Sequence, residues 1–215
     1  MMNIQSISWV ATTVVGGTLG APFVMKATRS WYRTIPLPSF TPPNAIFGPV
    51  WSLLYATMGI ASWRIRNIVL LKQTIHQSSK NIGVTGAGVG VGVGGGLLSS
   101  IQQHIMILSL IHYTLNIIWA PIFFGLKRFR LGHVLNITIW ATLIPIIIGY
   151  STLDLVSGLM LIPYFLWLSF AIRLSDGICK LNPTDAVKNG RLFNNAKLED
   201  EIWKLRKEAG ERVGL

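Results

Sequence analysis

The chain has 215 residues, of which 51% are hydrophobic and only 13% are charged, and its formal net charge is +11. An ordinary soluble domain carries about 25% charged residues, so this composition excludes a globule with a wholly polar surface. All eight acidic residues lie at Asp154 or later, which excludes carboxylate-based metal, glycosidase or kinase chemistry from the first two thirds of the chain.

Three further features narrow the class of protein. The basic excess alternates with long apolar runs, which is typical of a membrane protein with basic loops rather than of a nucleic-acid-binding protein. The single cysteine, Cys179, excludes an intramolecular disulfide framework and a zinc site of several cysteines. No Lys or Arg precedes Lys26, so we predict no cleavable signal peptide.

Five apolar stretches are long enough to cross a bilayer as helices, which takes about 20 residues. They cover about residues 4–25, 45–66, 104–126, 132–150 and 155–176. The last two come from one run, 131–172, in which Asp154 is the only charged residue. A single helix of that length would measure about 63 Å, so we predict a turn at 149–154, with Asp154 as the N-cap of the fifth helix.

The fold class is therefore predicted as all-α, an integral membrane bundle of five transmembrane helices formed by residues 1–183. Residues 83–96 are a Gly/Val-rich, low-complexity insertion in the loop between the second and third helices, which we interpret as a flexible linker. Residues 184–215 are predicted to be a charged cytosolic tail. The loops on one side of the bundle, with the start of the tail, hold ten Lys and Arg residues against four on the other, which predicts a cytosolic C-terminus.

Residues 31–63 combine prolines with aromatic residues. Prolines between Pro36 and Pro43 cannot lie within a helix and predict a rigid loop at the membrane face. Trp51, Tyr55, Met58 and Ser62 share one face of the following helix. A rigid loop above an aromatic face suits a pocket for a flat apolar ligand, but core packing or an aromatic belt would give the same pattern. The predicted lid comprises Pro42, Pro43, Phe47, Gly48 and Pro49.

This segment resembles the signature of the translocator protein family, also called tryptophan-rich sensory proteins or peripheral-type benzodiazepine receptors. The similarity rests on Trp31-Tyr32, Pro42-Pro43, the run from Gly48 to Trp51, Leu54-Tyr55 and Met58-Gly59. Two later blocks, 115–125 (LNIIWAPIFFG) and 161–171 (LIPYFLWLSFA), resemble the family's third and fifth helices. Three separate blocks in the corresponding helices make the resemblance specific.

The resemblance implies a membrane receptor or transporter-like protein that binds tetrapyrroles such as protoporphyrin IX and heme, and in some members sterols. Carried over by position, it implies the ligand-binding residues Trp51, Tyr55, Asn116, Trp119, Trp167, Phe170 and Ala171. Trp51 and Trp167 match a tryptophan pair linked to light-dependent porphyrin breakdown. No obligatory cofactor and no metal site are expected. Leu37 and Ala45 replace a basic residue and a tryptophan of the signature, and Asp176 interrupts the proposed sterol motif.

Several alternatives stay open. The chain is more readily interpreted as a binding protein than as an enzyme, but a light- and oxygen-dependent porphyrin-degrading activity and a stress-related membrane scaffold are both considered. His104 or His112 could ligate heme iron, although a hydrogen bond between helices is the favoured role for His112. Gly16 and Gly20 suit close packing within the bundle, with homodimerisation as the alternative. The expected membrane is the outer mitochondrial membrane or the endoplasmic reticulum.

Overall fold

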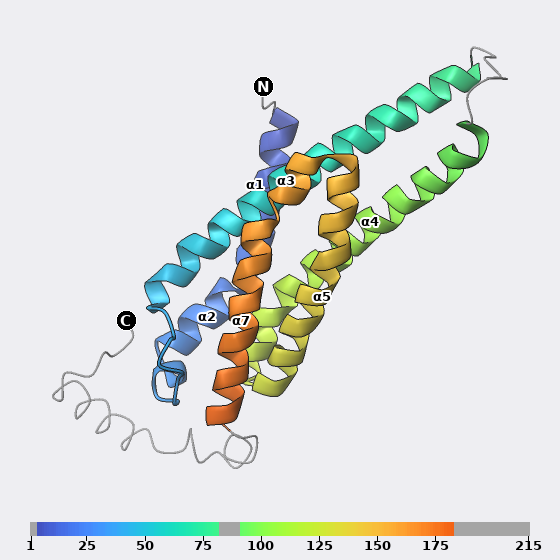
Figure 1. Cartoon of the computed structure of the whole chain (residues 1–215). Helices are drawn as coiled ribbons and strands as arrows, with labels where there is room; N and C mark the ends of the chain where they lie inside the picture. The colour runs from blue at the N-terminus through green and yellow to red at the C-terminus, as the bar shows by residue number, and fades with distance from the viewer. Residues whose placement is uncertain (1–3, 82–90, 183–215) are drawn as a thin grey trace.

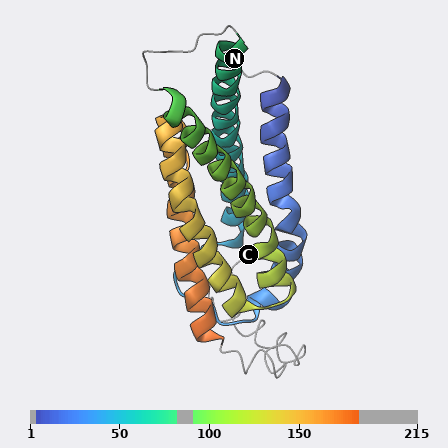
Figure 2. The same cartoon turned by 90° about the vertical axis from the view of Figure 1, so that its right-hand side faces the viewer.

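The computed structural model describes residues 4–81 and 91–182 and contains helices without strands across these ranges. Five helical spans are long and apolar enough to cross a membrane, namely Ile4–Thr28, Asn44–Ile75, Gln102–Gly125, Phe129–Leu153 and Leu155–Leu181. They run alternately up and down as a bundle (Figures 1 and 2). The all-α, five-helix class predicted from the sequence is confirmed. The predicted tail, 184–215, lies outside the described residues.

The first span is interrupted rather than continuous. It consists of α1 (Ile4–Gly17), the short 3-10 helix η1 (Thr18–Gly20) and α2 (Ala21–Thr28). Pro22 occupies the first turn of α2 and has no N–H to continue the preceding ladder of hydrogen bonds. Gly20 approaches α4 so closely that an added Cβ would lie 2.7 Å from the Cβ of Ala120. The predicted small-residue packing within the bundle is therefore confirmed for Gly20.

The second span lies in α3 (Asn44–Asn81), which follows the short helix η2 (Trp31–Arg33) and a proline-rich loop. Our predicted end near residue 66 was wrong, because α3 continues for four more turns. Charged residues do not end a helix by themselves, and residues 67–81 contain no Gly or Pro. The end of α3 projects past the other helices together with the start of α4 (Figure 1).

The third span lies in α4 (Val91–Ala120) and ends in a π-helical turn, η3 (Pro121–Gly125). Because α4 begins at Val91, the last six residues of the Gly/Val-rich insertion are helical, which corrects the predicted linker 83–96. Glycine is only about 1 kcal/mol less favourable than alanine in a helix interior, so a helix can extend into such a segment where no proline stops it. Residues 83–90 of the insertion lie outside the described part.

The remaining helices are α5 (Phe129–Leu153), the short α6 (Leu155–Leu159) and α7 (Ile162–Leu181). As predicted, Asp154 ends α5 and caps α6, and its carboxylate accepts a hydrogen bond from the Ser157 N–H. The fifth span was predicted as one helix, but a turn at Met160–Leu161 divides it. Pro163 follows in the first turn of α7, where its missing N–H costs little.

Two buried clusters hold the helices together. The larger one joins α3, α5 and α7 through residues such as Ala61, Ile65, Leu143 and Leu168. The smaller one, around Tyr32, Ile35, Phe123, Phe129 and Ile178, closes the end of the bundle at which α2 and α7 finish. Large apolar side chains such as Leu53, Leu110 and Leu166 are exposed on the outside, as expected for helices that face lipid.

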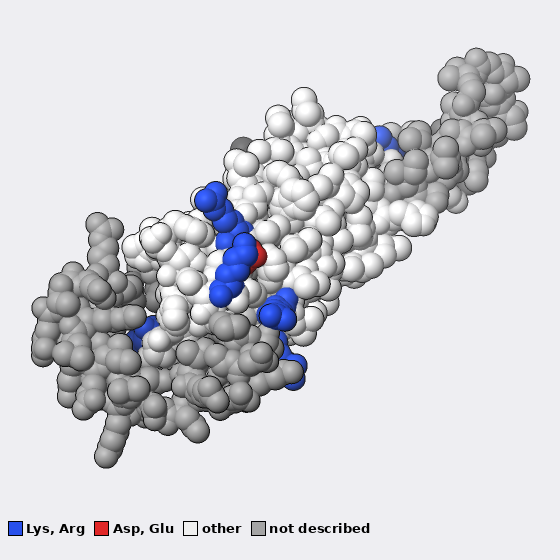
Figure 3. Space-filling model, turned by 60° about the horizontal axis from the view of Figure 1, so that its bottom comes forward, with Lys and Arg blue, Asp and Glu red and all other residues white. Residues whose placement is uncertain are grey.

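The charged residues of the described ranges lie towards the two ends of the bundle. On the face shown in Figure 3 it is almost entirely basic. Eight bases lie around the end formed by α2, η2, the loop after η3 and α7, and four lie in the second half of α3. The first group is Lys26, Arg29, Arg33, Lys127, Arg128, Arg130, Arg173 and Lys180, and the second is Arg64, Arg66, Lys72 and Lys80.

Candidate functional site

A pocket of about 460 Å³ opens within the bundle and is lined by all five spans. Its volume falls within the roughly 300–1,000 Å³ that is typical of small-molecule sites. The pocket lies near the basic end of the bundle, between α2, the first turns of α3, the last turns of α4, the start of α5 and the part of α7 from Trp167 to Ile178. None of the described residues that line it is charged.

The structure brings all seven residues implied by the resemblance into the wall of this pocket. They are Trp51, Tyr55, Asn116, Trp119, Trp167, Phe170 and Ala171. They come from three helices and are separated by up to 120 positions in the chain, so this gathering depends on the fold. The structure shows their proximity, and their roles in binding stay a prediction.

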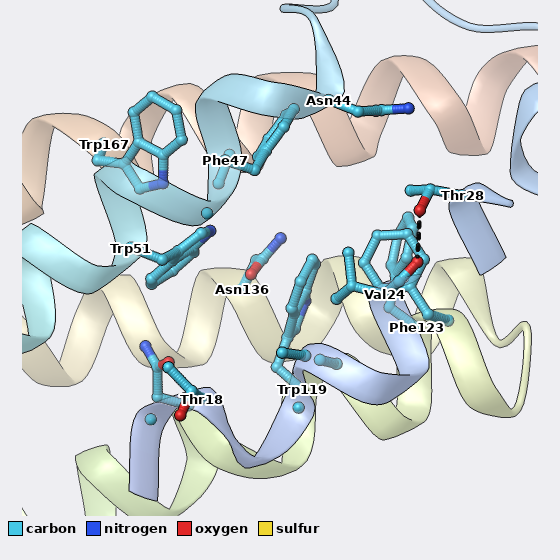
Figure 4. Close-up of a pocket in the computed structure, with 18 of the residues that line it drawn as sticks. Thr18, Val24, Thr28, Asn44, Phe47, Trp51, Trp119, Phe123, Asn136 and Trp167 are labelled. Atoms are coloured by element: carbon cyan, nitrogen blue, oxygen red, sulfur yellow. Dashed lines mark hydrogen bonds between the residues drawn. The ribbon is translucent and has the colours of Figure 1, made fainter. Parts of the chain in front are cut away.

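Aromatic rings form most of the wall between α3 and α7. The Trp51 ring stacks on Tyr55 with centroids 5.5 Å apart and meets Trp167 edge-on at 6.5 Å. Phe47 packs against the other side of Trp167 at 5.8 Å. The rings of Phe47, Trp51, Trp119 and Trp167 surround a common space (Figure 4). Such an arrangement offers flat π-surfaces in two nearly perpendicular directions.

The predicted lid needs correction. Phe47 and Gly48 line the pocket, but they and Pro49 belong to the first turns of α3, whereas Pro42 and Pro43 lie in the preceding loop and do not line it. A proline without its N–H is tolerated near the start of a helix, which is why the helix includes Pro49. The rigid element over this part of the pocket is thus a helix end.

The proline-rich loop is attached to α7. The Asn182 side-chain Nδ2 donates to the Pro36 carbonyl at 2.9 Å, and the Phe40 ring meets Phe170 edge-on at 6.4 Å. The Arg173 guanidinium lies over the Phe40 ring, with its central carbon 5.3 Å from the ring centroid, which is within the reach of about 6 Å for a cation–π contact. The loop therefore covers the end of the bundle in a fixed position.

A directed chain of hydrogen bonds lies behind the pocket wall and links α3, α4, α5 and α7. The Tyr55 hydroxyl donates to Asn116 Oδ1 at 2.6 Å, and Asn116 Nδ2 donates to the Tyr164 hydroxyl. Tyr164 in turn meets His112 Nε2 at 3.1 Å, and His112 Nδ1 meets the Thr142 hydroxyl at 2.9 Å. Because Thr142 donates its own proton to the Ile139 carbonyl, His112 Nδ1 is the protonated nitrogen and Nε2 accepts from Tyr164.

These hydrogen bonds decide between the two roles considered for His112. His112 is buried and both of its ring nitrogens are engaged by other helices, so the favoured interpretation as an interhelical hydrogen-bonding residue is confirmed. Asn116 also has a partner at each end of its amide. Its exposed edge still lines the pocket, but the amide is oriented by Tyr55 and Tyr164. In the described part of the chain, no three His, Cys, Asp or Glu side chains are grouped as metal ligands.

Some lining residues were missed by sequence reasoning. Thr18, Val24 and Thr28 come from η1 and α2, and an uninterrupted first helix gave no reason to place them there. Tyr32 also lines the pocket, and burial raises the pKa of its phenol, which keeps it neutral. Asn136 on α5 was missed although it is a polar residue at membrane depth, which is a signal for a functional role.

The fold and the pocket define the class of protein. This is a multi-pass integral membrane protein whose five helices enclose an uncharged, aromatic small-molecule pocket. Residues 9–181 match the family model of the TspO/MBR family. The chain therefore belongs to the TspO/MBR family, as the resemblance predicted.

Individual relatives agree with this assignment. The chain is 26% identical to Protein CrtK of Rhodobacter capsulatus, over 85% of this chain and 94% of that protein. It is 28% identical to a translocator protein homolog of Schizosaccharomyces pombe, over 72% of this chain and 79% of that protein. The human translocator protein is 24% identical over 80% of this chain and 86% of its own length. Membership of the family supports a membrane receptor or sensory role.

Proposed function

We propose that the chain binds a tetrapyrrole such as protoporphyrin IX or heme in this pocket, for its trafficking or disposal, and that sterols or other flat lipophiles can occupy the same space. The observation that carries the proposal is the wall of perpendicular and stacked aromatic rings around about 460 Å³ of uncharged space. A porphyrin is a wide π-surface, and indole rings stack on such a surface while they exclude water.

Charge around the pocket supports an anionic ligand. The eight bases at this end of the bundle lie outside the lining, and a cluster of one sign attracts the opposite charge over distances up to about a Debye length, roughly 8–10 Å. A porphyrin could thus place its ring among the apolar residues and its propionates towards the bases. The same bases would also hold this end of the bundle against anionic lipid headgroups.

The test is a titration of the purified full-length chain with protoporphyrin IX in the dark, read as quenching of tryptophan fluorescence. Trp167→Leu removes an indole that packs against Trp51, Phe47 and Phe170, and we expect a loss of affinity of about tenfold or more. Trp140→Leu is the matched control, because Trp140 stacks on Phe165 and donates to Ser169 outside the pocket. Absence of quenching by protoporphyrin in the unmodified chain would refute the proposal.

A second candidate is the light- and oxygen-dependent degradation of a bound porphyrin. It is favoured by the contact between Trp51 and Trp167, which puts two oxidisable indoles side by side in the wall. Illumination of the complex in air should then bleach the porphyrin absorbance, and Trp51→Phe should bind porphyrin but slow the bleaching. Quenching in the dark without bleaching in the light would leave the binding function and exclude this activity.

The membrane, orientation and assembly are proposed from the sequence. We propose the outer mitochondrial membrane or the endoplasmic reticulum, with the C-terminus in the cytosol, which imaging of a tagged chain would test. Homodimerisation is also proposed, but Gly16 and Gly20 do not provide its surface. Added Cβ atoms there would meet Tyr113 and Ala120 of the same chain. The sedimentation of the purified protein in detergent would measure the oligomeric state.

A further inference from the structure

Asn136 gives the pocket a polar feature that the proposed function does not use. Its side chain is 3% exposed and lines the pocket, and it points into the space near Trp51 and Trp119 (Figure 4). The amide Nδ2 donates to the Ser175 hydroxyl at 3.2 Å. Among the described residues, no donor reaches the amide oxygen, and that oxygen is not sealed inside the protein as the Oδ1 of Asn182 is. It is therefore open to the pocket.

The neighbours of Ser175 fix which end of the amide faces the ligand. The Ser175 hydroxyl has one proton, which it donates to the Ile172 carbonyl at 3.0 Å. His133 Nδ1 lies 2.9 Å from the same hydroxyl. Whether the hydroxyl proton goes to Ile172 or to His133, none remains for Asn136, so Ser175 can only accept from the amide nitrogen. The amide is thus held with its N–H on Ser175 and its oxygen towards the pocket.

We infer that Asn136 is a specificity-determining residue that selects flat apolar ligands carrying a hydrogen-bond donor, O–H or N–H, on the part that faces α5. This inference rests on the proposed pocket function and names the chemistry of the ligand more closely. An acceptor that loses water without gaining a donor costs about 1–3 kcal/mol. A ligand hydroxyl at this place donates a hydrogen bond to the Asn136 amide oxygen. An ether or a carboxylate has no proton to donate, so the amide oxygen stays unpaired.

The site is distinct from Asn116, the other pocket amide. The Oδ1 of Asn116 already accepts from Tyr55, and its Nδ2 donates to Tyr164. Asn136 lies on the neighbouring helix, α5, and only its nitrogen has a partner in the described structure. Asn136 therefore offers an oriented amide oxygen without a partner among the described residues, in a wall that is mostly aromatic and apolar, and a few placed polar groups of this kind give specificity in small-molecule sites.

The test compares two flat probes, hydroxypyrene and methoxypyrene, which differ in one donor. Both absorb where tryptophan emits, so energy transfer from the pocket indoles measures their binding to the full chain in lipid nanodiscs. We expect the unmodified protein to prefer hydroxypyrene by about tenfold. In Asn136→Leu, which keeps the side-chain volume, the preference should fall to about one, because methoxypyrene binds more tightly and hydroxypyrene less.

Ser175→Ala provides a second variant that retains Asn136. It removes the partner that orients the amide, so the preference should fall by severalfold while both probes still bind. Ser169→Ala on the same helix is its control, since Ser169 accepts from Trp140 away from the pocket and should leave the preference unchanged. The inference would be overturned if the unmodified protein, Asn136→Leu and Ser175→Ala all showed the same preference for hydroxypyrene over methoxypyrene. Absence of binding by both pyrenes and by protoporphyrin would instead overturn the proposed function itself.

Discussion

The guanidinium Nε of Arg64 lies 2.8 Å from the Oδ2 of Asp154, which ties the middle of α3 to the turn between α5 and α6. The same oxygen accepts from the Ser157 hydroxyl at 2.5 Å. Asp154 is the acid that the sequence places between the last two spans, and its carboxylate thus serves as a helix cap and as half of an ion pair. It fixes the end of the bundle opposite the pocket.

Removal of this ion pair should make the protein less stable in a pH-dependent way. The Arg64 partner, followed by the Ser157 hydroxyl, lowers the pKa of Asp154 from 3.8 to about 2. A carboxyl group whose pKa is lower in the folded state stabilises that state at pH values above its pKa in the unfolded chain. This contribution disappears as the pH falls from about 4 to about 2. Asp154→Asn keeps the N-cap but should cost about 1 kcal/mol at neutral pH and flatten the acid dependence.

Thermal unfolding in detergent, followed by circular dichroism over this pH range, would measure both effects. Asp176→Asn is the control, because Asp176 pairs with Lys180 one turn away on the same exposed helix face, where water screens the pair, and it should leave the stability nearly unchanged. The assignment fails if Asp154→Asn has the same acid dependence as the unmodified chain.

The hydrogen-bond chain behind the pocket should depend most on Tyr164. This residue is fully buried and contacts both Asn116 and His112. Tyr164→Phe would leave an amide N–H and an imidazole nitrogen without partners, which we expect to cost about 2–6 kcal/mol of stability, since each unsatisfied group costs about 1–3 kcal/mol. Tyr150→Phe is a matched control that breaks a single bond, to Ser109, and should cost about 1 kcal/mol. If the two variants lose the same stability in thermal unfolding, the hydrogen bonds of Tyr164 contribute no more than one ordinary bond.

His112 should not be an axial ligand of bound heme. Coordination of iron would require His112 to give up the Thr142 or the Tyr164 contact and to move out of a buried position. We therefore expect His112→Asn, which can still make hydrogen bonds, to leave the heme absorption spectrum of the complex unchanged. A shift of the Soret band in this variant, with no shift in a His104→Asn control, would contradict this assignment.

Much of the fold could be predicted from the sequence, because it depends on the lengths of the apolar segments and on a few strong local signals. Runs of apolar residues predicted the five spans, and Asp154 predicted the division between the last two. The C-terminal end of α3 and the start of α4 were harder to predict, because a bilayer sets a minimum length for a helix but no maximum. The break at η1 lies beside Pro22, whose missing N–H interrupts the helical hydrogen bonds, and this local signal was overlooked within an uncharged apolar run.

The pocket was predictable where the family motif contributed residues, and less so elsewhere. Trp51, Trp119 and Trp167 stand in recognisable blocks, whereas Asn136 stands in a helix whose sequence offers no such block. Its importance arises from Ser175 on α7, 39 positions away, which orients the amide. Of the residues expected to form the lid, Phe47 and Gly48 line the pocket, whereas Pro42 and Pro43 do not, because a series of prolines indicates a rigid loop but not the direction in which that loop lies.

The space between positions 20 and 120 should have room for the Cβ atom of only one of the two residues. Gly20→Ala would place two Cβ atoms 2.7 Å apart, well inside the roughly 3.5–4.0 Å of a favourable contact, so we expect a loss of about 1–3 kcal/mol. Both residues line the pocket, so protoporphyrin affinity should also fall. Ala120→Gly in the same chain should restore both properties.

Gly48→Ala is the matched control for this pair. An added Cβ at Gly48 meets no atom within 4 Å, and alanine favours a helix over glycine by about 1 kcal/mol, so this variant should unfold at a slightly higher temperature. If the double variant Gly20→Ala with Ala120→Gly is no more stable than Gly20→Ala alone, the close approach of the two helices is not the reason for the loss.

The uneven distribution of bases should set the orientation of the bundle. Eight bases surround the pocket end and four lie in the second half of α3, and the side richer in Lys and Arg usually stays in the cytosol. A protease added from the cytosolic side should therefore remove a C-terminal tag and spare an N-terminal one. Both tags should be cleaved once detergent opens the membrane, which controls for access. Digestion of the N-terminal tag in sealed membranes would reverse the orientation and turn the pocket end away from the cytosol, so that porphyrin would have to enter from the other compartment.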